Sequence, residues 1–212
     1  YSIPEFFDRC DGPPSTYWDS YPGVTLATTP VYSPPTSYQM ASADKRGQLV
    51  SEYGSVEQTG GVNLFFYDDT SITSTNFYVA LENNNARGVI RMLGVRNETT
   101  QNNYSYSMDG VTWEDLGIAR STGWHNVVMT ANETEGLTMY IDDPTAAQTD
   151  PTFQTFTRVI IDGGTDADPY FVDDMAIHAI PLLDERPLPV SSPFFLALTL
   201  LVIGAVLVLR RK

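Results

Sequence analysis

The sequence predicts an all-β protein, a two-sheet antiparallel sandwich followed by one C-terminal transmembrane helix. Before residue 190 there is almost no helical periodicity, and short runs rich in Val, Ile, Tyr, Phe and Thr recur between clusters of Gly, Asn, Asp and Pro. This pattern is typical of β-sandwiches. Residues 190–209 carry no charge. The roughly 180 residues before them suffice for one domain with a sizeable core.

Eight segments have the composition of strands. Alternation is clear in several of them: in Leu137-Thr-Met-Tyr-Ile141 the first, third and fifth residues face the same side. The predicted strands are 61–67, 76–81, 88–95, 103–108, 125–130, 137–141, 158–161 and 170–180.

Two turn signals predict hairpins. Asp109-Gly110 readily supplies the positive φ values of a tight turn and would join residues 104–108 to 111–113. A longer polar loop, 132–136, would join the strands on either side of it. In contrast, residues 11–37 are rich in Pro, Ser, Thr and Tyr, which predicts an irregular wrapping segment.

Residues 190–212 set the predicted location. About 20 residues at 1.5 Å rise cover the roughly 30 Å hydrocarbon core, where a helix satisfies the backbone. The basic tail 210–212 predicts a cytoplasmic C-terminus. The domain, residues 1–180, is then expected in the periplasm or at the cell surface, close to the bilayer because the Pro-rich stalk 181–189 is short. Export implies that a signal peptide was removed before Tyr1.

The predicted helix also suggests partners. Small residues let transmembrane helices approach closely, and Ala197, Gly204 and Ala205 would serve that contact with another membrane subunit. The formal net charge of −14 disfavours nucleic acid and favours cations or basic partners.

Two kinds of residue bear on modification. Cys10 is the single cysteine, so no intrachain disulfide can form; a buried thiol and an intermolecular bridge both remain open. Asn97, Asn103 and Asn132 begin Asn-x-Ser/Thr sequons and would lie on exposed loops if they are glycosylated.

Over residues 4–180 the chain resembles the bacterial concanavalin A-like (laminin G-like) jelly-roll modules. The segments that carry the resemblance are Pro4-Glu-Phe-Phe-Asp8, 30–38, Ser121-Thr-Gly-Trp-His125, 137–142 and 170–177. The resemblance implies two stacked sheets and frequently a structural calcium ion, but no single activity. Pro187-Leu-Pro189, with the apolar span and basic cluster after it, is similar to exosortase sorting tails; because residues 190–212 are retained here, we expect a permanent anchor instead.

A calcium site is the metal site that the acidic residues suggest, because Ca²⁺ takes six to eight oxygen ligands. The resemblance implies that the first and last strands are neighbours, which would bring together Glu5, Asp8, Asp173 and Asp174. A second candidate comprises Asp162, Asp166 and Asp168. The alternative is that all of these are solvated loop acids.

The sequence favours binding over catalysis. The resemblance would imply Glu-x-Asp-x-x-Glu on one strand in a glycosidase, and neither Glu114-Asp115 nor Glu133-Thr-Glu135 has that spacing. His125 and His178 lie inside strand patterns and are expected to be structural, as is Trp124 in the core. Loop aromatic residues are the candidates for contacting a sugar or a partner: Tyr17, Trp18, Tyr21 and Trp113.

Three functions follow from these observations. The first is a non-enzymatic accessory or scaffold subunit of a larger membrane complex, photosynthetic or respiratory among others. The alternative is a carbohydrate-binding or cell-surface adhesion module. The second alternative is a glycan hydrolase, which requires a cleft with paired carboxylates.

Overall fold

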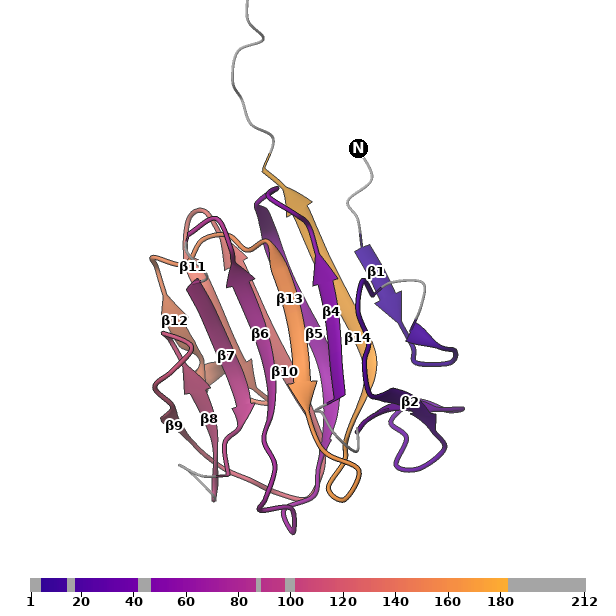
Figure 1. Cartoon of the computed structure of the whole chain (residues 1–212). Coiled ribbons are helices and arrows are strands. Elements are labelled where there is room, and N and C mark those ends of the chain that lie inside the picture. The colour runs from indigo at the N-terminus through magenta and orange to yellow at the C-terminus, as the bar shows by residue number, and fades with distance from the viewer. Residues whose placement is uncertain (1–4, 15–17, 42–46, 87–88, 98–101, 183–212) are drawn as a thin grey trace, which may run out of the picture. The chain divides into compact units, whose positions relative to one another are not determined.

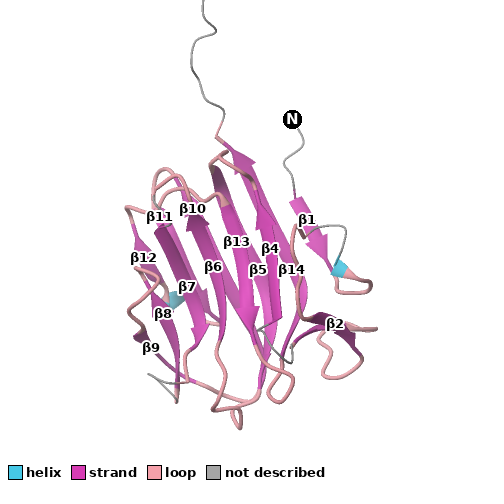
Figure 2. Ribbon diagram, viewed as in Figure 1, coloured by secondary structure: helices cyan, strands magenta, loops and turns pink. Residues whose placement is uncertain are grey.

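Two antiparallel sheets stacked face to face make up the domain in the computed structural model (Figures 1 and 2). The structure describes residues 5–14, 18–41, 47–86, 89–97 and 102–182. The predicted all-β sandwich is therefore confirmed. The predicted membrane helix, its packing residues, the basic tail and most of the stalk lie outside these residues. Within them, no helix is both long enough and apolar enough to cross a membrane.

The larger sheet has the strand order β12-β11-β10-β5-β14-β3-β2, and β1 also pairs with β14. Its strands are β1 (Glu5–Asp8), β2 (Val24–Ala27), β3 (Ser37–Met40), β5 (Gln58–Asp68), β10 (Gly123–Asn132), β11 (Gly136–Ile141), β12 (Gln148–Asp150) and β14 (Tyr170–Pro181). A short 3₁₀ helix, Pro144–Ala146, connects β11 to β12.

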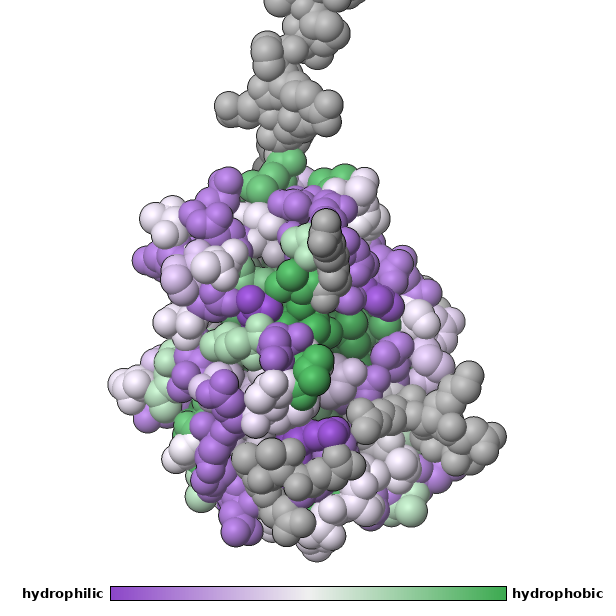
Figure 3. Space-filling model, turned by 60° about the vertical axis from the view of Figure 1, so that its left-hand side comes forward, coloured by the Kyte–Doolittle hydropathy of each residue, from purple (hydrophilic) through white to green (hydrophobic). Residues whose placement is uncertain are grey.

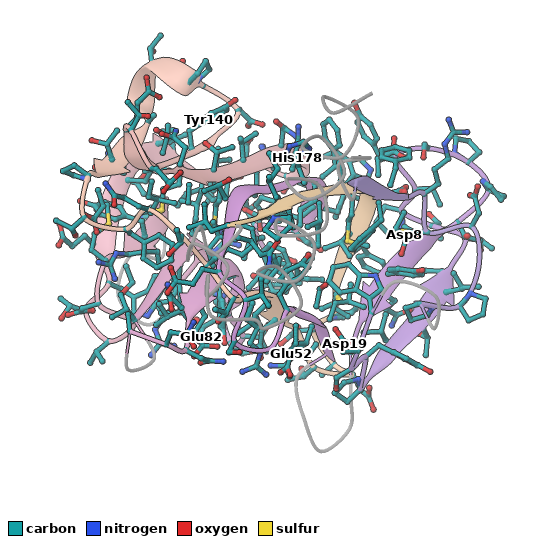
Figure 4. All side chains as sticks on the ribbon, turned by 90° about the horizontal axis from the view of Figure 1, so that it is seen from above. Asp8, Asp19, Glu52, Glu82, Tyr140 and His178 are labelled. Atoms are coloured by element: carbon teal, nitrogen blue, oxygen red, sulfur yellow. The ribbon has the colours of Figure 1, made fainter. Side chains whose placement is uncertain are left out.

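The smaller sheet has the strand order β4-β13-β6-β7-β8-β9. Its strands are β4 (Gly47–Glu52), β6 (Phe77–Asn83), β7 (Val89–Val95), β8 (Asn103–Ser107), β9 (Glu114–Ala119) and β13 (Arg158–Gly163). Seen from above, Glu52 and Glu82 of the smaller sheet lie on one side of the sandwich, and Tyr140 and His178 of the larger sheet on the other (Figure 4).

All eight predicted strands are present. Other strands, whose sequence patterns are weaker, were not predicted. The segment predicted to be irregular, residues 11–37, contains β2, a short strand at the end of the sheet path whose first and last residues are only half-buried. The Asp109-Gly110 turn is confirmed, since Gly110 has φ 78°. The chain does not re-enter the sheet at once, because Asp109 accepts hydrogen bonds from the backbone of Val111 and Thr112. The next strand therefore begins at Glu114.

The core lies between the sheets and follows from strand alternation. In β10 the side chains of Val127, Met129 and Ala131 point inward and are at most 1% exposed. Across the interface Phe66 of β5 stacks on Phe77 of β6, with ring centroids 4.7 Å apart. Burial of each such side chain contributes about 1.5–3 kcal/mol.

A buried ion pair joins the two sheets at one end of the sandwich. Arg120, in the link between β9 and β10, donates to Asp68 at the end of β5 through Nε (2.9 Å) and Nη2 (2.7 Å). Its side chain is 2% exposed and that of Asp68 is fully buried. Nη1 also donates to Asn97, which follows β7 in the smaller sheet. Because both charges are desolvated, each depends on the other for compensation.

Asp173 fastens the N-terminal segment to β14. Its fully buried carboxylate accepts the backbone N–H groups of Tyr32 and Ser33, both at 3.0 Å. The residue lies where the register between β14 and β5 shifts, and Asp174 there has φ 43°. Burial raises the pKa of Asp173 above its ordinary value, although the hydrogen bonds from Ser33, Asp174 and Tyr32 oppose this effect.

Replacement of Arg120 by Met is expected to lower the free energy of unfolding by about 3–5 kcal/mol, because Asp68 remains buried without a counter-charge. Urea denaturation measures this loss. The control is Arg158→Met, since Arg158 forms half-exposed pairs with Glu52 and Glu82; its loss should be about 1 kcal/mol or less. Equal losses in the two variants would contradict the assignment.

The pH dependence of stability tests Asp173. Because its pKa is raised in the folded state, its stabilising contribution is complete below about pH 4, the ordinary value, and is lost as pH rises through the raised value. The isosteric Asp173→Asn variant lacks this titration. The free energy of unfolding of the native protein minus that of the variant should therefore fall as the pH rises from about 4, the ordinary value, through the raised pKa. A difference that is constant or rises would exclude this role.

Candidate functional site

Aromatic side chains gather on the outer face of the larger sheet. Trp124 of β10 pairs with Tyr67 of β5, which pairs with Phe171 of β14, so the three lie in one row across three strands. Their chain neighbours His125 and Phe66 point inward, because side chains alternate along a strand. The rings of the row are half-buried and keep part of their surface accessible.

Tyr32 extends this row from the N-terminal segment. Its ring stacks on Phe65 with centroids 3.8 Å apart and an angle of 14°, and it meets Trp124 edge to face at 5.8 Å. Tyr32 is 45% exposed. The hydrogen bonds from its segment to Asp173 keep it in place. We call Tyr32, Phe65, Tyr67, Trp124 and Phe171 the aromatic face.

A pocket of about 330 Å³ opens beside the aromatic face. We call it the aromatic pocket; its lining includes Pro30, Tyr67, Asp69, Ser71, Asp168 and Phe171. The rings of Tyr67 and Phe171 are perpendicular, with centroids 6.5 Å apart. Apolar walls with a few placed polar groups are typical of small-ligand sites.

Neighbouring serines hold the two carboxylates of the pocket. The backbone N–H of Ser71 donates to Asp69 at 3.0 Å, and the Ser74 hydroxyl donates to Asp168. Hydrogen bonds from Ser71 lower the pKa of Asp69 below its ordinary value. Asp69 is therefore a carboxylate at neutral pH.

The buried ion pair also supports this pocket. Besides its bonds to Asp68, the Nη2 group of Arg120 donates to the backbone carbonyls of Asp69 (3.5 Å) and Ile72 (3.4 Å). Both residues line the pocket. Arg120 is thus a positioning residue for the loop that carries Asp69 and Ser71.

Three of the four predicted calcium ligands near the two ends of the domain have hydrogen-bond partners, and the side chain of Glu5 lies outside the described residues. Strands β1 and β14 do pair, with Asp8 opposite Met175 and Glu5 opposite His178. Asp8, however, accepts hydrogen bonds from Trp18 Nε1 (3.0 Å) and from the hydroxyl of Tyr38.

The second carboxylate pair is engaged in the same way, since Asp174 accepts the Ser33 hydroxyl at 2.7 Å and Asp173 holds the backbone of residues 32 and 33. Across the described ranges, no group of three or more His, Cys, Asp or Glu residues is arranged to hold a metal. In the structure, Asp8, Asp173 and Asp174 instead accept hydrogen bonds from N–H and O–H groups.

The second predicted acidic cluster is spread over different surroundings. Asp162 of β13 is 7% exposed and accepts Gln48 Nε2 at 2.9 Å. Asp166 is exposed in the loop before β14, and Asp168 lines the aromatic pocket. Asp168 is thus the member of this cluster that belongs to a described pocket.

The predicted aromatic contact residues have separate roles. Trp18 is 4% exposed, packs against Phe6 and donates to Asp8, so the expectation that it offers an exposed surface is corrected. Tyr21 is 41% exposed, and Tyr17 lies outside the described residues. Trp124, expected in the core, lies instead on the aromatic face.

Trp113 lies on the opposite outer face, that of the smaller sheet. It packs with Tyr78 and Ile90 against an apolar cluster of Val50, Ala80, Met92 and Ile160. Figure 3 shows one face of the molecule, on which hydrophobic surface gathers near the middle. The Arg96 guanidinium lies 5.9 Å from the Trp113 ring.

The sequons and the cysteine are placed as follows. Asn97 is 1% exposed and its amide donates to the carbonyl of Thr75, so it is not on an exposed loop and offers no room for a glycan. Asn103 begins β8 and donates to Asp115, and Asn132 lies at the β10–β11 turn. Cys10 is fully buried, and burial raises the pKa of its thiol.

Ser121, His125 and Asp142 resemble a nucleophilic triad in composition. His125 Nδ1 lies 2.7 Å from Asp142, and Nε2 lies 3.4 Å from the Ser121 hydroxyl. Nε2 lies closer to the Ser121 carbonyl oxygen, at 2.7 Å. Since a carbonyl oxygen only accepts, this short contact favours a hydrogen bond from Nε2–H to the Ser121 carbonyl over a contact with the Ser121 hydroxyl. These contacts tie His125 to Asp142 and to the backbone of Ser121.

Comparisons with known proteins show the fold. No protein-family model matches the chain, and a search of curated sequences finds no match. The fold is similar to that of a Bacillus licheniformis β-glucanase, at 10% identity and a TM-score of 0.55 over 83% of this chain and 98% of that one. It is also similar to a cellulose-induced protein, at 13% identity and a TM-score of 0.51 over 81% and 96%, and to a glycosidic hydrolase, at 12% and 0.50 over 82% and 94%. The domain therefore has the jelly-roll sandwich fold of these proteins, as the resemblance to concanavalin A-like modules predicted.

Proposed function

We propose that this protein is a carbohydrate-binding module, and that the aromatic pocket and the aromatic face beside it form its glycan site. One observation carries the proposal: accessible rings from three adjacent strands lead to a pocket that contains two oriented carboxylates. Aromatic rings stack on the apolar faces of sugars, and carboxylates accept hydrogen bonds from sugar hydroxyls. The similarity of the fold to a β-glucanase and to a cellulose-induced protein supports the ligand class.

We propose binding and not hydrolysis for this pocket, because Asp69 does not fit the role of the acid. Glycoside hydrolysis needs one carboxyl group whose raised pKa keeps it protonated as the acid. The pKa of Asp69 is lowered instead, because Ser71 stabilises its charged form. The proposed role of Asp69 is therefore to accept hydrogen bonds from a ligand.

The site lies at one end of β14 and the chain continues from the other. Phe171, near the start of β14, lines the aromatic pocket, and Leu182 follows its last residue. Twelve residues of strand span about 40 Å. If the tail anchors the domain outside the cytoplasm, as we propose, the anchor follows the end of the strand that is remote from the pocket. The accessory-subunit function stays a prediction, since no described contact identifies a partner.

Replacement of Tyr67 or Trp124 by Ala is expected to weaken glycan binding at least tenfold, about 1.4 kcal/mol, because each removes a stacking ring. Binding constants are measured by calorimetry with the oligosaccharide that a glycan array selects. The control is Trp113→Ala, which removes a half-buried ring from the opposite outer face and should leave affinity unchanged.

The control separates this site from the other face of the sandwich. If Trp113→Ala weakens binding as much as Tyr67→Ala does, the glycan site is not on the larger sheet. If no glycan binds the native protein, the proposed function fails. Urea denaturation of each variant verifies that it is folded.

A further inference from the structure

We infer that the aromatic pocket selects glycans with free amino groups, such as glucosamine oligomers, over neutral and anionic ones. This inference rests on the proposed function and names its ligand class. The cavity and its aromatic walls make the site; the charge of the pocket selects among the sugars that could stack there.

The charge of the lining is entirely negative. Asp69 and Asp168 are its two ionisable acids, and none of the nine described lining residues is Lys, Arg or His. The chain as a whole has a net charge of −14. Such a pocket attracts an ammonium group and repels the carboxylate or sulfate of an acidic sugar.

Both carboxylates are already oriented before a ligand arrives. Asp69 is held by the Ser71 backbone and Asp168 by the Ser74 hydroxyl, so little side-chain freedom remains to be lost on binding. The loop that carries Asp69 is itself held by Arg120, which donates to the Asp69 carbonyl. Because Ser71 lowers the pKa of Asp69, its charge persists in mildly acidic solution, where amino sugars are protonated.

The aromatic walls favour the same ligand. Tyr67 and Phe171 stand perpendicular to each other at 6.5 Å, so one ring can stack on a sugar while the other presents its face to the amino group. Cations are attracted to the faces of aromatic rings, and neutral N-acetyl groups are not. The pocket therefore combines a stacking surface with two sources of cation affinity.

Calorimetry on the full chain in detergent at pH 5.5 and low salt tests this inference. The probes are hexamers of glucosamine, N-acetylglucosamine and glucose. The glucosamine hexamer is expected to bind at least tenfold more tightly than the other two. Asp69→Asn and Asp168→Asn should each lower the affinity for the glucosamine hexamer much more than the affinity for the N-acetylated hexamer, and so remove most of this preference. Higher salt should weaken binding of the glucosamine hexamer selectively.

A matched control separates the pocket from the acidic surface in general. Asp166 is exposed, is two residues from Asp168 and does not line the pocket. Asp166→Asn should therefore keep the preference for glucosamine. Loss of the preference in Asp166→Asn, as in Asp69→Asn, would overturn the assignment to the pocket.

The remaining outcomes separate this inference from the proposed function. Equal affinity for all three hexamers would overturn the amino-sugar inference and leave glycan binding intact. Failure of every glycan to bind would overturn both. A lysine-rich peptide of the same charge serves as a further probe: if it binds more tightly than the glucosamine hexamer, the pocket recognises ammonium groups of proteins, and the sugar assignment is wrong.

Discussion

The buried pair of Arg120 and Asp68 is the interaction on which the end of the domain with the aromatic pocket depends. Two sheets held together by apolar contacts alone have no polar group that fixes how their loops meet. Arg120 supplies that group, because its guanidinium donates to Asp68 of the larger sheet, to Asn97 of the smaller sheet and to the carbonyls of Asp69 and Ile72. Burying these charges is costly, and the hydrogen bonds offset the cost only in this geometry. The same geometry fixes the position of the loop that contains Asp69 and Ile72.

The sequence predicted the strands with strong alternation and missed those without it. In strands such as β10 and β11 apolar residues recur at every second position and lie in the core, so their sequence pattern predicts a strand. In β2 the two middle residues are exposed, and in β9 only one of six residues is buried, so neither carries a clear pattern. Pairing with a neighbouring strand defines these two, and pairing is a tertiary property.

Part of the candidate site could be predicted from the sequence. Val127 and Met129 point inward, so alternation alone places His125 inward and Trp124 outward, and that signal was available in the sequence. The pocket was not predictable, because Pro30, Asp69 and Asp168 come from distant loops that only the folded chain brings together. Trp18 shows the converse limit: an aromatic residue in a Pro-rich loop reads as exposed, yet Asp8 provides the hydrogen bond that allows it to be buried.

The acidic residues at the two ends of the domain illustrate a choice that sequence patterns do not resolve. A desolvated carboxylate needs either a cation or hydrogen-bond donors. Asp8 and Asp173 both have donors, from Trp18 and Tyr38 in one case and from the backbone of the N-terminal segment in the other. The N-terminal segment is thus joined to the last strand by N–H and O–H groups. Its attachment also positions Tyr32 on the aromatic face.

The length of β14 has a mechanical consequence. The strand has the aromatic pocket at its start and the chain's exit at its end, and it pairs with β5 on one side and with β1 and β3 on the other. If the tail is anchored while a fixed polymer occupies the pocket, tension runs along the strand axis. The interstrand hydrogen bonds, which lie across the strands, are then sheared together rather than opened one after another. Under the proposed anchoring and glycan binding, a pull on the polymer would then be shared among the hydrogen bonds along the strand.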